Sequence, residues 1–185
     1  MDPKTMVVIA VAVIALLLVV WAVLRKRQRT VVLRQNFGPE YDRVVKERGA
    51  TRAETVLAER QKRVEKFSLR TLTVDERERF ITEWRIIQAR FVDDPSDAVN
   101  EADTLVTRLM QFRGYPVTDF EQRAADISVH YPRVVDNYRA AHEVALRHQR
   151  GEATTEDLRN SMIYYRTLFD ELLETNSVRV KREVA

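Results

Sequence analysis

Three histidines, His130, His142 and His148, are the side chains of this chain best suited to bind a metal or to transfer protons near neutral pH. The chain has no cysteine, so thiolate metal sites and structural disulfides are excluded. It also lacks the HExxH pattern, which places two histidines on one face of a helix. His142 and His148 are six positions apart and therefore fall on different helix faces. We expect ordinary helix histidines, with no metal and no cofactor.

Two pairs of neighbouring carboxylates, Asp93–Asp94 and Glu156–Asp157, are the next candidates, because paired carboxyl groups can act as general acid and base. The first pair precedes a proline and the second follows two threonines, which are patterns typical of helix starts. The chain has neither a glycine-rich phosphate loop nor a GxSxG motif. We therefore predict that the chain is not an enzyme. One alternative stays open, an unfamiliar catalytic site formed by His130, His142 and Glu121.

Aromatic and arginine side chains gather between positions 113 and 142. Tyrosine and arginine are favoured at protein interfaces, so this segment could carry a recognition surface. Packing in a helical core is the alternative for most of the aromatics, because they also fit apolar helical stripes. The candidate interaction surface consists of Arg113, Tyr115, Phe120, Arg123, Tyr131 and His142.

The first element that positions these side chains is an apolar run of nineteen uncharged residues, Met6–Leu24. As a helix it is roughly 28 Å long, close to the hydrocarbon thickness of about 30 Å. We expect an uncleaved transmembrane helix that crosses the membrane once. A cleaved signal peptide is the alternative, but it needs a shorter apolar region and a small-x-small cleavage site. The run instead ends with bulky residues and a basic cluster.

Four basic residues lie within five positions after this run. Basic flanks tend to stay in the cytoplasm, so we expect the N-terminus outside and the rest of the chain on the cytoplasmic side of the inner or plasma membrane. The cluster could also attract anionic lipid, at about 1 kcal/mol per basic residue. Beyond position 34 the chain has 25 basic and 27 acidic residues, so we predict no nucleic-acid partner. The flank consists of Arg25, Lys26, Arg27 and Arg29.

The remaining sequence predicts an all-α fold, a soluble helical bundle that follows the transmembrane helix. Thr73 with Glu76 and Thr118 with Glu121 fit capping boxes, and apolar residues recur at helical spacing in four stripes. Four such stripes can form a common core. The expected parts are a tail (1–5), a transmembrane helix (6–24), a basic juxtamembrane segment and linker (25–50), a charged helix or loosely packed arm (51–72), a helical bundle (73–174) and a flexible tail (175–185).

The chain resembles a group of bacterial proteins that have an N-terminal anchor and no assigned activity, and that are often labelled secreted. The resemblance covers most of residues 35–175 and implies no activity, cofactor or catalytic residue. The label conflicts with the orientation predicted from the basic flank, which we retain. The resemblance is carried by Phe37–Asp42, Phe91–Pro95, Arg113–Pro116, Asp119–Asp126, His130–Pro132 and Tyr138–His142.

These features favour a membrane-tethered protein-interaction or scaffold module, with the lipid bilayer and a protein as partners. Two alternatives remain at this stage. One is a membrane-surface sensor that binds anionic lipid through the basic flank, and the other is an enzyme with an unrecognised site.

Overall fold

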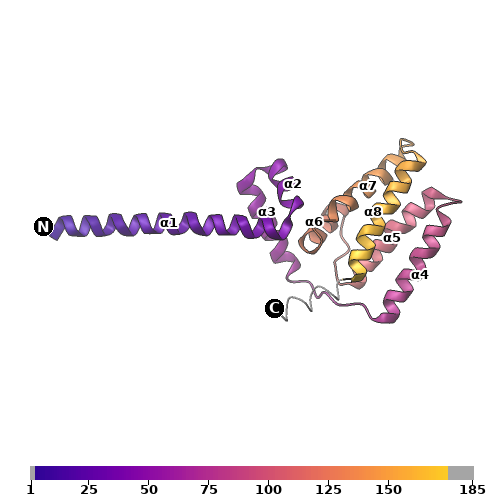
Figure 1. Cartoon of the computed structure of the whole chain (residues 1–185), viewed down its shortest axis with the longest axis horizontal. Coiled ribbons are helices and arrows are strands. Elements are labelled where there is room, and N and C mark those ends of the chain that lie inside the picture. The colour runs from indigo at the N-terminus through magenta and orange to yellow at the C-terminus, as the bar shows by residue number, and fades with distance from the viewer. Residues whose placement is uncertain (1–2, 175–185) are drawn as a thin grey trace. The chain divides into compact units, whose positions relative to one another are not determined.

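The structure is a computed structural model that describes residues 3–174, with the backbone alone described for residues 3–12, Ala22 and Lys26. All regular structure in this range is helical, which confirms the all-α prediction (Figure 1). The expected tail 175–185 lies outside the described residues. The chain divides into two compact units, residues 1–57 and 58–185. The helices are α1 (Pro3–Phe37), α2 (Pro39–Arg48), α3 (Ala50–Val64), α4 (Val74–Arg90), α5 (Pro95–Phe112), α6 (Phe120–His130), α7 (Val135–Gln149) and α8 (Thr155–Glu174).

The first unit is built around the C-terminal end of α1, where the chain turns sharply into α2. Gly38 makes this corner with a φ of 47°, a conformation that glycine adopts without steric cost. Pro39 then occupies the first turn of α2, where a missing N–H is harmless. Buried Leu33, Phe37 and Tyr41 contribute to a small core. The expected linker within residues 25–50 is therefore helical, because the corner lets α1 and α2 pack on each other.

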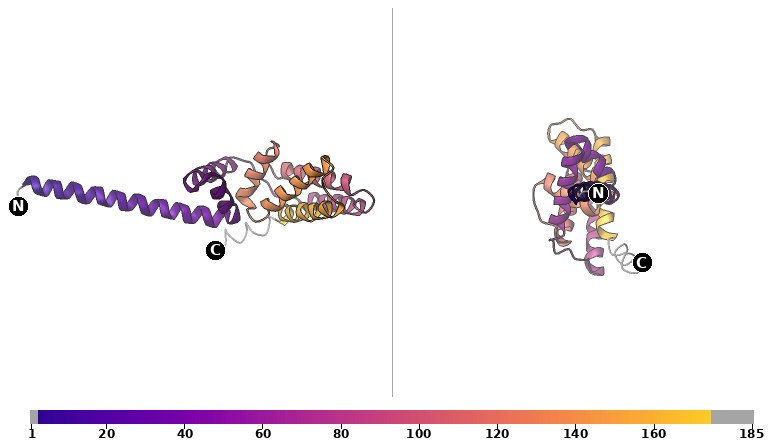
Figure 2. Two further views of the ribbon diagram at one scale, coloured as in Figure 1. Left: turned by 90° about the horizontal axis from the view of Figure 1, so that it is seen from above. Right: turned by 90° about the vertical axis from the view of Figure 1, so that its left-hand side faces the viewer.

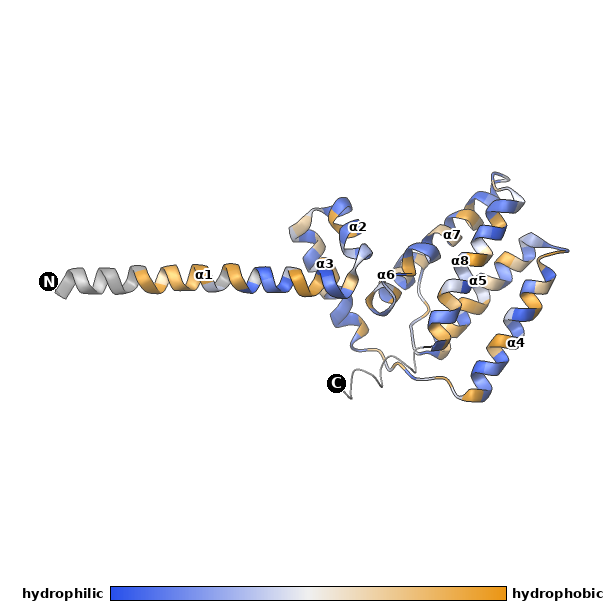
Figure 3. Ribbon diagram, in the orientation of Figure 1, coloured by the Kyte–Doolittle hydropathy of each residue, from blue (hydrophilic) through white to orange (hydrophobic). Residues whose placement is uncertain are grey.

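The N-terminal part of α1 presents its large apolar side chains to the surface. From Val13 to Leu24 ten of them are exposed, by 47% at Val20 and up to 64% at Leu16. Figure 3 shows this stretch as an apolar band followed by a hydrophilic one. Side chains 6–12 of the expected membrane span lie outside the described residues. Among the described residues, no helix combines the length and the apolar character that crossing a membrane requires.

The second unit is a bundle in which α4, α5, α8 and α7 lie side by side, with α6 against α7 (Figures 1 and 2). The four predicted apolar stripes belong to α4, α5, α7 and α8 and turn most of their residues inward, and α6 adds buried residues of its own. The core contains large side chains from every one of these helices, including Trp84, Leu105, Leu109, Ile127, Tyr138, Tyr165 and Phe169.

Short-range caps start several of these helices. Thr73 and Glu76 form the predicted capping box at α4, with each side chain bonded to the other residue's backbone N–H. At α6 the cap is Asp119, whose carboxylate accepts from the backbone N–H of Gln122 at 3.0 Å. The prediction of a capping box from Thr118 to Glu121 is therefore wrong: a single side-chain cap at Asp119, one residue later, starts α6, because a carboxylate caps as well as a hydroxyl.

The C-terminal half of α3 packs closely within the second unit. Arg63 pairs with the buried carboxylate of Asp126 at 2.6 Å, and Arg60 donates to Ser128 at 3.3 Å. Val64 is buried as well. The expectation of a loosely packed arm does not hold for this stretch, because its charges meet polar partners on α6 instead of water.

Candidate protein-interaction groove

A groove of about 880 Å³ lies between α4 and α8 on the surface of the second unit. The two helices run antiparallel, since Arg77 near the start of α4 donates to the carbonyl of Leu173 near the end of α8. We refer to this feature as the α4/α8 groove. Its lining residues are Trp84, Gln88 and Phe91 from α4, and Arg159, Met162, Ile163, Arg166, Thr167, Asp170, Glu171 and Glu174 from α8.

Large buried side chains form the floor of the α4/α8 groove. The ring of Trp84 stacks on the ring of Phe169, with centroids 4.8 Å apart and an interplanar angle of 25°. Both residues are buried, and so is the neighbouring Met162. The Nε1 donor of Trp84 has no hydrogen-bond partner among the described residues. Among the described residues the floor is thus mostly apolar with one unpaired donor, and buried donors left unpaired are uncommon in proteins.

The rim of the groove is charged, and its two halves differ in sign. The guanidinium of Arg166 lies 5.5 Å from the Trp84 ring centroid, and its Nε donates to Asp170 at 2.7 Å. Ile163 stands between the charged positions and is 55% exposed. Among the groove-lining residues of α8 the basic ones come first and the acidic ones follow, although Glu156 in the first turn precedes them and pairs with Arg159. The rim therefore has a basic end, which includes the exposed Ile163 between Arg159 and Arg166, and an acidic end.

Three residues of the interaction surface predicted from sequence belong to the core. Arg113, Tyr115 and Tyr131 are only 5–6% exposed. Arg113 donates to the carbonyl of Leu172 at 3.1 Å, and the Tyr115 hydroxyl lies 2.7 Å from Nδ1 of His130. Burial also raises the pKa of Tyr115. These side chains hold the bundle together, so they cannot form an exposed recognition face.

The other three predicted surface residues lie at or near a second hollow of about 580 Å³. Phe120 and His142 line it, and their rings stack with centroids 3.6 Å apart. Partial burial is the main cause that lowers the pKa of His142. Arg123 instead donates to the Tyr138 hydroxyl at 3.3 Å and to the Thr118 carbonyl at 3.0 Å. The ring stack and these bonds give the three side chains structural roles.

The residues of the enzyme alternative do not converge on one site. His142 and Glu121 line the same hollow, but His130 is at the far end of α6, bonded to Tyr115. His148 contacts the Ser96 hydroxyl at 2.6 Å. Within residues 3–174, no three histidine or carboxylate side chains are placed to hold a metal ion.

A buried polar cluster at the centre of the bundle was not predicted from the sequence. Tyr138 and Tyr165 are fully buried, and their rings lie at 68° to each other. Burial is the largest cause that raises the pKa of Tyr165, and the charge of the Asp103 carboxylate is the second. Oδ1 of Asp103, Oγ1 of Thr107 and the Tyr165 hydroxyl are buried without a hydrogen bond of ordinary geometry among the described residues, although Asp103 lies close enough to Tyr165 to affect its pKa. The available signal was Asp103 and Thr107, which are four positions apart and therefore share one face of α5.

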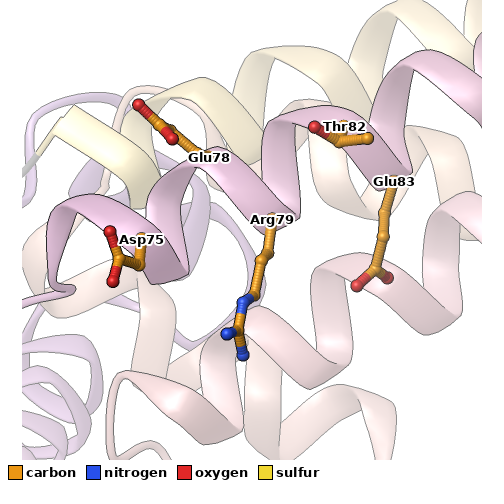
Figure 4. Close-up of a pocket in the computed structure, with 5 residues that line it drawn as sticks. All are labelled: Asp75, Glu78, Arg79, Thr82 and Glu83. Carbon is orange, nitrogen blue, oxygen red and sulfur yellow. The ribbon is translucent and has the colours of Figure 1, made fainter.

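A third hollow, of about 480 Å³, is lined by α4 alone. Figure 4 shows Asp75, Arg79 and Glu83 on one side of the helix and Glu78 and Thr82 on the other. Glu83 pairs with Arg108 of α5. Charged side chains from a single helix form a solvated face, so we assign no chemistry to this hollow.

Comparisons with protein-family models, with curated proteins and with solved structures find no match to this chain. The resemblance to anchored bacterial proteins therefore stays a prediction from the sequence.

Proposed function

We propose that this chain is a single-pass, membrane-anchored scaffold whose helical bundle binds a protein segment in the α4/α8 groove. The observation that carries the proposal is the groove itself. Its aromatic floor and its arginine rim contain the residue types that dominate binding energy at protein interfaces. A groove between two antiparallel helices also suits an amphipathic helix, which buries its apolar face there.

The anchor in this proposal is the apolar run of residues 6–24. The exposed apolar side chains of its described part support it, since burying one such side chain is worth about 1.5–3 kcal/mol. A contiguous apolar surface of this kind is typical of contact with a membrane or a partner. In this proposal the bundle faces the cytoplasm, which the positive-inside tendency of basic flanks supports. The proposal assigns no reaction and no cofactor.

A second candidate function is a membrane-surface sensor that uses the basic flank. Arg25, Arg27 and Arg29 are exposed, and the guanidinium of Arg25 lies 5.0 Å from the Trp21 ring centroid. An interfacial tryptophan beside exposed arginines suits a headgroup layer. The side chain of Lys26 lies outside the described residues. Replacing the four flank residues with glutamine should then weaken binding to anionic vesicles at low salt.

The anchor is tested by alkaline carbonate extraction of membranes that contain the full chain. The wild-type chain should stay in the pellet. A double variant, Leu17→Asp with Val20→Asp, should move to the supernatant, because each charge costs about 2.5–3.5 kcal/mol near the centre of a membrane helix. The control is Val32→Asp, an exposed apolar position of α1 beyond the run, which should stay in the pellet. Complete extraction of the wild type would overturn the anchor.

The groove is tested by site-specific photo-crosslinking in the same membranes. A photoreactive residue at Ile163 should give a discrete product with a protein, because this exposed side chain stands at the centre of the groove rim. The control is Thr82, which is exposed on α4 and lines the third hollow. Equal products at the two positions, or no product at Ile163, would contradict the proposed binding role.

A further inference from the structure

We propose that the α4/α8 groove binds a second copy of this chain, with the two α8 helices antiparallel across a twofold axis. This inference rests on the proposed binding role of the groove and names its partner. The argument comes from the order of charges along one face of α8. Arg159 and Arg166 lie on the first half of that face, and Asp170, Glu171 and Glu174 lie on the second half.

This order makes the α8 face complementary to itself in one direction only. In a twofold dimer the same patch meets itself, and antiparallel helices place the first half of one opposite the second half of the other. The basic end of each copy then meets the acidic end of its partner. A parallel arrangement would instead oppose like charges along the whole groove. The helix dipoles favour the antiparallel arrangement as well.

The same charges fix a register. Pairing Arg159 with Glu174 of the second copy places the twofold axis between Arg166 and Thr167. Thr167 and Arg166 then lie beside their own counterparts at the axis, and Asp170 of the second copy lies within one turn of Arg166. The exposed Ile163 lies one turn from the axis, where the second helix covers it. Arg159 and Glu174 are roughly 22 Å apart along one helix, so they cannot pair within a single chain.

Two exposed ion pairs within α8 do not oppose this exchange of partners, and Glu171 and Glu174 also interact with other groups. Arg159 bonds to Glu156 at 2.5 Å and Arg166 bonds to Asp170 at 2.7 Å, and all four side chains are at least 43% exposed. Exposed pairs between neighbouring turns contribute little to stability. Contacts across the dimer would replace them in a less solvated setting, above the stacked rings of Trp84 and Phe169.

The test uses the absence of cysteine from the wild-type sequence. Full-length chains carrying Thr167→Cys should form a dimer-sized product in native membranes under mild oxidation or with a short bismaleimide. Thr82→Cys is the matched control, a threonine exposed on α4 and outside the groove, and it should give at least roughly fivefold less dimer. A Thr167→Cys variant that crosslinks no better than the control would overturn the self-association.

Charge reversal then tests the register in the Thr167→Cys background. Arg159→Glu and Glu174→Arg should each lower the crosslinked fraction roughly fivefold, because like charges meet twice in every dimer. The double variant should recover it, and such rescue can only arise between two chains. Recovery supports the antiparallel register, and its absence overturns it. Circular dichroism of each variant confirms that the helices are intact.

The photo-crosslink at Ile163 separates this inference from the proposed function. A product with twice the mass of the chain supports both. A product of any other mass keeps the binding role of the groove and overturns the second copy as its occupant. The absence of any product from Ile163 would overturn both the binding role of the groove and the second copy as its occupant.

Discussion

Helices α1 and α5 are both rich in apolar residues, but they place them in opposite ways. In α5 the apolar positions form one stripe, and Ala102, Leu105 and Leu109 of that stripe are buried. In α1 the apolar residues from Val13 to Leu24 surround the helix and are exposed. A stripe with polar residues opposite suits a bundle in water, whereas an apolar surface on all sides suits lipid. The pattern of apolar residues, more than their number, distinguishes the two helices.

The largest effect that can sharpen this comparison comes from cutting a leucine down to alanine in each helix. Leu105→Ala in α5 should lower the free energy of unfolding by about 2–5 kcal/mol, because it leaves a cavity in a packed core. Leu17→Ala in α1 should change it by about 0.5 kcal/mol or less, because Leu17 has no packed surroundings to lose. Denaturant unfolding of the full chain in mild detergent measures both. Equal losses of stability in the two variants would contradict the difference in packing between α5 and α1.

The next largest effect is expected from removing one ion-paired carboxylate in each unit, Asp126 in the second and Asp42 in the first. Asp126→Ala should cost about 1–3 kcal/mol, because the buried carboxylate also accepts from Gln122 and both donors lose their partner. The matched change is Asp42→Ala, which removes an exposed pair with Arg34 and should cost about 0–1 kcal/mol. The same denaturant unfolding experiment measures both variants. A larger loss of stability for Asp42→Ala than for Asp126→Ala would contradict this expectation.

The third comparison replaces two glycines that have a positive φ, Gly114 and Gly38, by alanine. At Gly114 an added Cβ clashes with the carbonyl oxygen of Ser68, so Gly114→Ala carries both steric and conformational strain. At Gly38 an added Cβ meets nothing within 4 Å, so Gly38→Ala carries only the conformational cost, about 1–3 kcal/mol. We expect the Gly114 variant to be the less stable of the two in thermal unfolding. The reverse order would show that the close approach at Gly114 is unimportant.

The smallest effect concerns pH and the start of α4. The Arg70 guanidinium, followed by the backbone N–H of Thr73, lowers the pKa of Glu76 to about 2. A carboxylate with a lowered pKa in the folded state stabilises the fold above its unfolded pKa, near 4.5, and loses that contribution as the pH falls toward 2. Glu76→Gln should therefore flatten the stability curve between these values. A curve identical to that of the wild type would show that the ion pair contributes nothing.

Much of the fold could be predicted because it depends on residues close in sequence. The apolar stripes and the capping box at Thr73 follow from spacings of three and four positions. Gly38 followed by Pro39 also carried a signal for a helix corner, although it was assigned to a linker. These features need no knowledge of how the helices pack.

The rest depended on contacts between distant positions. Arg63 meets Asp126 across 63 positions, so the charged pattern of α3 looked solvated when its end is packed. Tyr115 and Arg113 have the composition of an interface, but buried bonds to His130 and to the Leu172 carbonyl satisfy them in the core. The α4/α8 groove exists only because α5 holds both helices side by side, which no local pattern encodes.

The environment of α1 tests the central claim most directly. Single cysteines at Leu17 and Val32 can be treated with a membrane-impermeant maleimide in inside-out vesicles, since both native side chains are exposed on the helix surface. We predict labelling at position 32 and none at position 17 until detergent dissolves the membrane. Equal labelling of the two positions in intact vesicles would show that the apolar run lies in water and would contradict the membrane anchor.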